Sequence, residues 1–139
     1  MADAQTYPVD VNDGLPYALN IAVPIGDSYR KPWALQRDTG TAAAVNLTGV
    51  TWTLIISTAR NGPVKLSKTI TTDWTASGIY IDSAAAGQFT VYVLAADVTA
   101  LGVGPWYYEV EATFGASHAD FPSMVKTLFR GTFNVTEDA

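Results

Sequence analysis

The sequence predicts an all-β domain, namely an Ig-like antiparallel β-sandwich of about eight strands preceded by an extended N-terminal arm. Apolar residues recur at every second position in several runs, and turn residues separate these runs at short intervals. No helical pattern is long enough to connect two parallel strands, so mostly antiparallel sheets are expected. We expect the arm to span residues 1–18 and the sandwich to span residues 19–139.

The strongest strand signal covers residues 50–57, where Val50, Trp52, Leu54 and Ile56 fall on one face. Alternate strand residues point to the same side of a sheet, so this pattern indicates one buried and one solvated face. The same period predicts strands in residues 88–93 and 106–114, and the less regular candidates are residues 19–25, 28–36, 64–71 and 78–82.

The final run, residues 124–135, does not keep a single alternation. Phe129, Phe133 and Val135 share one face, whereas Lys126 and Leu128 fall on the other face together with polar residues. Such a change of phase predicts a β-bulge or an edge contact. With residues 115–122 as the connecting loop, the last two strands should form the clearest hairpin.

One short helix is expected at residues 96–101. Asp97 is placed to cap it because a carboxylate accepts hydrogen bonds from early backbone amides, and Gly102 can adopt the left-handed conformation that ends a helix.

The composition is low in charge, with 15% charged residues and a net charge of −5. Soluble domains commonly carry about 25% charged residues, so the surface should be neutral and inexpensive to desolvate against another subunit. The negative charge argues against nucleic acid and anionic membrane surfaces as partners. No basic region followed by an apolar run opens the chain, so we expect synthesis in the cytoplasm.

The sequence predicts no catalytic residue, cofactor or metal. It contains no cysteine and a single histidine, His118, which we expect to be solvated at a hairpin tip. Glu109 and Glu111 would stand about 7 Å apart on one strand face, near the separation found in glycosidases. Both face solvent in the predicted strand, where water equalises their pKa values, so a non-catalytic role is favoured.

Two sets of residues are candidates for binding. The arm contains prolines and aspartates without a sustained period, and arms of this kind often lie on a neighbouring subunit, although a frayed terminus fits equally well. Its candidate subunit contacts are Tyr7, Pro8, Val9, Val11, Leu15 and Tyr17. Alternatively, outward-pointing aromatic rings could stack on sugars, and the candidates for glycan contact are Trp74, Tyr92 and Tyr107.

From Gly26 onward, the order of these signals resembles a β-sandwich module of tailed-bacteriophage virion proteins. The modules concerned are the N-terminal-like domain of upper baseplate proteins and related tail-tip or head-decoration modules. The resemblance rests on Gly26-Asp27 before Trp33, Asp38-Thr39-Gly40, Asn46-Leu47-Thr48-Gly49 before Trp52, and the segments 78–81, 97–101, 104–110 and 127–135.

This resemblance implies a virion structural protein with no cofactor and no active-site residues. The N-terminal arm and the lack of an appended fibre segment depart from a baseplate arm protein. They favour a small head-decoration, neck or tail-accessory component. We therefore expect a homo-oligomer, with a trimer favoured, that binds other virion structural proteins in the particle. The alternative is a carbohydrate-binding or adhesin-like module.

Overall fold

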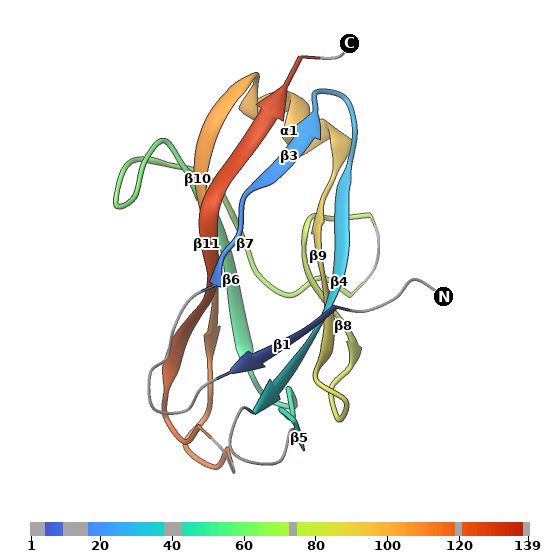
Figure 1. Cartoon of the computed structure of the whole chain (residues 1–139), viewed down its shortest axis with the longest axis vertical. Helices are drawn as coiled ribbons and strands as arrows, with labels where there is room; N and C mark the ends of the chain where they lie inside the picture. The colour runs from blue at the N-terminus through green and yellow to red at the C-terminus, as the bar shows by residue number, and fades with distance from the viewer. Residues whose placement is uncertain (1–4, 10–16, 38–42, 73–74, 119–120, 138–139) are drawn as a thin grey trace.

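The computed structural model describes residues 5–9, 17–37, 43–72, 75–118 and 121–137. Within these ranges the chain forms eleven strands and one short helix, arranged as two facing sheets (Figure 1). The predicted all-β sandwich is therefore confirmed. The described residues form more strands than the predicted eight or so. Two of them, β2 (Tyr17–Ala18) and β5 (Ala43–Ala44), are only two residues long.

The first sheet has the strand order β1-β4-β9-β8, and β5 pairs with the end of β4. Its strands are β1 (Gln5–Val9), β4 (Tyr29–Arg37), β8 (Gly78–Ser83) and β9 (Gln88–Val93). The second sheet has the order β2-β11-β10-β6-β7, and β3 also pairs with β11. Its other strands are β3 (Ile21–Pro24), β6 (Thr51–Ser57), β7 (Val64–Lys68), β10 (Gly104–Thr113) and β11 (Val125–Thr136).

The connectivity is Ig-like. Strands β4, β9 and β8 take the positions of strands B, E and D, whereas β11, β10 and β6 take those of G, F and C. These central pairings are antiparallel, as predicted. Three pairings are parallel, however: β1 with β4, and both β2 and β3 with β11. All three involve strands that precede β4, and their partners are β4 and the distant strand β11.

The described parts of the predicted arm pair within the chain. Gln5–Val9 aligns with residues 33–37 of β4, and Tyr17–Ala18 aligns with Phe129 and Arg130 of β11. The next residues continue along β11 as β3, and the Tyr108 hydroxyl donates a 2.7 Å hydrogen bond to the Leu19 carbonyl. The division into arm and sandwich at residue 18 stays a prediction.

Gly131 permits this close approach of the N-terminal segment to β11. A Cβ atom at this position would lie 2.3 Å from the Leu19 carbonyl oxygen. In its absence, the Leu19 amide donates to the Arg130 carbonyl at 3.0 Å and the Thr132 amide donates to Asn20 Oδ1 at 3.1 Å. A glycine inside a strand thus marks a place where two backbones meet.

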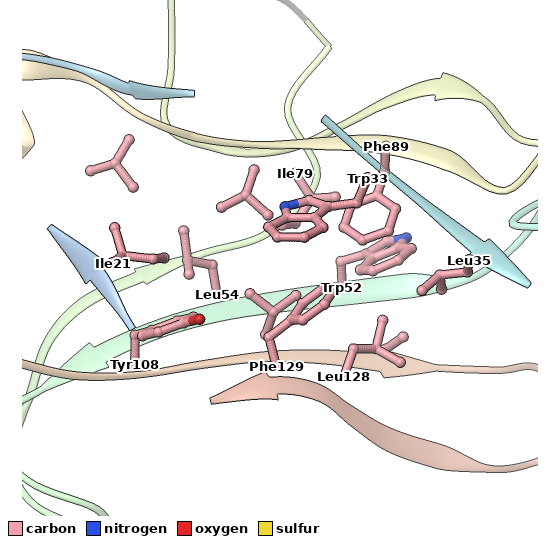
Figure 2. Packing of buried hydrophobic residues seen from close by; sticks show 14 of the residues in the cluster. Ile21, Trp33, Leu35, Trp52, Leu54, Ile79, Phe89, Tyr108, Leu128 and Phe129 are labelled. Carbon is pink, nitrogen blue, oxygen red and sulfur yellow. The ribbon is translucent and has the colours of Figure 1, made fainter. Parts of the chain in front are cut away.

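The core lies between the sheets and is built around four aromatic residues, two from each sheet (Figure 2). Trp33 lies 4.9 Å from Phe129 between ring centroids, and Trp52 lies 4.8 Å from Phe89. Phe89 and Phe129 join the two pairs at 6.1 Å. Every one of these contacts crosses from one sheet to the other, so the cluster holds the layers together.

The last strand contains a β-bulge at the predicted change of phase. The sequence had allowed either a bulge or an edge contact there. Val110 pairs with Phe129 and Glu111 pairs with Thr127, so Leu128 is the extra residue. The bulge reverses the inward face, and Lys126, Leu128 and Phe129 are therefore all buried. The Lys126 ammonium lies 5.7 Å from the Phe121 ring centroid.

Candidate functional site

A pocket of about 130 Å³ lies between the helix α1 (Ala95–Leu101) and strand β7. The start of β10 contributes its third wall, and the lining residues are Lys65, Leu66, Asp97, Ala100, Leu101 and Trp106. A buried cavity of about 150 Å³ holds a benzene ring, whereas small-molecule sites usually measure about 300–1,000 Å³. The pocket therefore has room for a group about the size of one side chain.

Three hydrogen bonds to side chains position α1 beside this pocket. The Ser77 hydroxyl donates to Asp97 Oδ2 and accepts from the Leu94 amide at 2.8 Å, while Ser28 Oγ accepts from the Ala95 amide at 3.1 Å. The prediction that Asp97 caps the helix is wrong. Leu94 is the N-cap residue, and its apolar side chain makes no cap hydrogen bond. The Asp97 carboxylate lies inside the first turn and accepts from the Ser77 hydroxyl of another loop.

Gly102 ends the helix with φ of 84°, as predicted, and also anchors the pocket wall. Its carbonyl accepts a 3.0 Å hydrogen bond from Trp106 Nε1, which holds the half-buried indole between β10 and the helix. Sequence reasoning missed this pocket because its residues come from three separate segments. The Gly102–Trp106 spacing carries no signal that would have identified it.

The two glutamates considered for catalysis lie on the outer face of the second sheet, as predicted. Both are half-buried, and Glu109 Oε1 accepts a 2.6 Å hydrogen bond from the Tyr107 hydroxyl. Glu109 is aligned with Arg130 on β11 and with Ile55 on β6. The pair therefore sits on a sheet face with a tyrosine and an arginine beside it.

Tyr107 has its pKa raised above the ordinary tyrosine value. Burial is the main cause, followed by the hydrogen bond to Glu109 and the negative charge of that carboxylate. The positive charges of Arg60 and Arg130 act in the opposite direction. Tyr107 is therefore kept protonated as a hydrogen-bond donor on this face.

His118 is not simply solvated, so this prediction is wrong. Its Nδ1 accepts from the Phe121 amide at 3.1 Å, and its Nε2 lies 2.6 Å from the Asn46 carbonyl oxygen. A carbonyl only accepts, so both contacts are satisfied by the tautomer with the proton on Nε2. The ring also packs against Phe114 and Phe121, and His118 thereby ties the β10–β11 loop to the loop before β6.

The candidate glycan contacts do not form one platform. Tyr92 and Tyr107 alternate with inward-facing neighbours on β9 and β10, so they occupy the outer faces of opposite sheets. Trp74 lies outside the described residues. Sugar contact through any single one of these residues stays a prediction.

The candidate subunit contacts divide between two strands and undescribed residues. Tyr7, Pro8 and Val9 belong to β1, and Tyr17 belongs to β2. Val11 and Leu15 lie outside the described residues. Contact of this segment with another subunit stays a prediction.

Searches of the described residues looked for metal-binding groups and membrane-spanning helices. They found no group of three or more His, Cys, Asp or Glu side chains able to hold a metal ion. They also found no helix long and apolar enough to span a membrane.

A scan against protein-family models and a search of curated proteins found no match to this chain.

Proposed function

We propose that the chain is a structural protein of a bacteriophage particle, where it assembles as an oligomer with other virion proteins. Head decoration, neck and tail or baseplate accessory are the candidate positions. The bacteriophage assignment rests on the sequence resemblance described above. The α1–β7 pocket, about 130 Å³, has room for a single side chain of such a protein partner.

The low charge supports the same proposal. With 15% charged residues, the chain offers a surface that loses little hydration energy when another protein covers it. A stable contact of standard size removes about 1,600 Å² from water. The whole described surface measures 7239 Å², so each subunit of an oligomer has ample area for such contacts.

The proposal is tested by counting the protein in particles. Particles purified by density gradient from the bacterium that carries the gene should contain this chain in fixed proportion to the major capsid protein. The purified chain should behave as a trimer in multi-angle light scattering. Finding the chain in the soluble lysate but not in particles would refute the virion assignment, and a monomer at all concentrations would refute the trimer.

Carbohydrate binding remains the alternative function. Because Tyr92 and Tyr107 lie on the outer faces of opposite sheets, such a site could not use both of them. A glycan array with the Tyr107→Ala and Tyr92→Ala proteins distinguishes the two functions. Binding of a defined glycan that one of these changes abolishes would favour the alternative.

A further inference from the structure

We propose that β7 and the adjoining α1–β7 pocket form a docking edge for an extended, acidic segment of a partner protein. The segment would add to the second sheet as a strand beside β7 and place one apolar side chain in the pocket. This inference rests on the proposed function, because it identifies the kind of virion-protein segment that the chain would bind. Three observations support it.

The first observation is the open edge of β7. This strand lies at the end of the second sheet and, among the described residues, its only strand partner is β6. After Lys68 the chain leaves this edge, and Thr69 and Thr71 bond instead to Ile79 of β8 in the other sheet. Strands at a sheet edge present unpaired backbone N–H and C=O groups, which another extended segment can use.

The second observation is the pocket next to that edge. Lys65 and Leu66 belong both to β7 and to the pocket wall, so the pocket adjoins the strand with which the partner segment would pair. Trp106, Leu66 and Leu101 supply apolar surface, and the volume of about 130 Å³ accepts one ring or branched aliphatic group. Val64, 54% exposed at the start of β7, extends the apolar contact.

The third observation is the charge of the edge. Arg60, Lys65 and Lys68 are three of the eight basic residues of a chain whose net charge is −5. Residues 60–72 contain no aspartate or glutamate, and the carboxylate of Asp97 in the pocket wall accepts a hydrogen bond from the Ser77 hydroxyl. Like charges facing each other across two strands are destabilising, so the lysines oppose pairing of β7 with the same strand of a second copy. They favour a partner strand that carries carboxylates.

The experiment uses the full chain and a synthetic probe. The probe is an acetylated and amidated heptapeptide with phenylalanine at its centre, valine on either side of it and glutamate at the second and sixth positions. Binding is followed by amide chemical shifts of the labelled protein. We expect a dissociation constant on the order of 100 μM, with the shifts confined to β7, α1 and the start of β10.

Two protein variants, each with a matched control, examine the contacts. Ala100→Trp should fill the pocket and weaken binding by about tenfold or more, whereas Ala96→Trp, on an exposed helix position outside the pocket wall, should have no effect. Lys65→Gln should weaken binding by about two- to fivefold, whereas Arg30→Gln removes the same charge from the other sheet and should not. The unperturbed amides of each variant verify that it is folded.

Two control peptides complete the test. Lysine in place of both glutamates should abolish binding, and alanine in place of phenylalanine should weaken it by about tenfold. Equal binding of the lysine peptide, shifts located elsewhere, pairing of β7 with a second copy, or no binding at about 1 mM would each overturn the proposal. Because the peptide experiment uses only the purified chain, its failure leaves the particle count as an independent test of the proposed function.

Discussion

At the scale of single residues, the polar side chains of this domain mainly position other parts of the chain. Ser77 and Asp97 hold the short helix, and His118 joins two loops. Tyr107 and Glu109 form a hydrogen-bonded pair on an outer sheet face. The bonds of Asp97 and His118 join separate segments of the chain, whereas Tyr107 and Glu109 are two residues apart on β10.

The first residue-scale prediction concerns Tyr107 at alkaline pH. Its pKa is raised by burial and by Glu109, so the folded protein keeps the proton to a higher pH than the unfolded chain. The resulting stability is fully present below the unfolded pKa of about 10 and is lost as the pH rises through the folded pKa. Urea unfolding between about pH 8 and pH 12 should show a smaller alkaline loss in Tyr107→Phe than in the unchanged protein.

Glu109→Gln is the matched control for this effect. It removes the negative charge that helps to raise the pKa of Tyr107, so the tyrosinate titration of Tyr107 should move to a lower pH. An identical alkaline loss in the Tyr107→Phe protein would mean that Tyr107 does not contribute to it.

The second residue-scale prediction concerns His118. His118→Ala leaves the Phe121 amide and the Asn46 carbonyl without their present partner and should lower the free energy of unfolding by about 1–3 kcal/mol. Ser117→Ala changes an exposed neighbour in the same loop and should have an effect within about 0.5 kcal/mol. Equal effects of the two changes would indicate that the histidine is solvated, as its position in the sequence suggests.

At the scale of elements, the strands and turns agree closely with the two-residue pattern. The predicted strands 50–57, 88–93 and 106–114 correspond to β6, β9 and β10, and their inward residues are buried or, for Trp106, half-buried. The bulge in β11 was visible as a change of phase. The pairing of β1 and β2 was not visible, because residues 1–18 show no sustained apolar period and their pairing depends on distant strands.

A glycine substitution tests the connection between β4, β5 and the β8–β9 turn. Gly87 has φ of 69°, and a Cβ there would meet the Leu35 and Val45 carbonyl oxygens at 2.6 and 2.9 Å. Gly49 has φ of 75° with open space around its Cβ position, so Gly49→Ala should cost only the left-handed strain of about 1–2 kcal/mol.

Gly87→Ala adds a clash with backbone to that strain and should cost at least about 1 kcal/mol more than Gly49→Ala in urea unfolding. The same loss for both substitutions would show that the turn can shift away from the strands without cost.

At the scale of the whole molecule, the aromatic cluster holds the two sheets together. Phe129 contacts Trp33 and Phe89 of the opposite sheet. The stability of a domain is commonly about 5–15 kcal/mol, so a single interlayer contact can account for a large share of it.

Phe129→Ala should therefore lower the free energy of unfolding by about 3–5 kcal/mol, because it removes a fully buried ring and leaves a cavity between the sheets. Val125→Ala, on the same strand but 58% exposed, should change it by less than about 0.5 kcal/mol. A loss below about 1 kcal/mol for Phe129→Ala would contradict the central place of this cluster.

The sequence by itself determined the fold class, the inward faces of the central strands and the terminal hairpin, and it limited the phase change in the last strand to a bulge or an edge contact. These features follow from the local alternation of apolar and polar residues, which depends only on neighbours along the chain. Only the tertiary structure decided the parallel pairing of the N-terminal strands, the bonds of Asp97 and His118, and the pocket between α1 and β7. Each of these joins residues from separate segments, and their contacts exist only after the two sheets have packed.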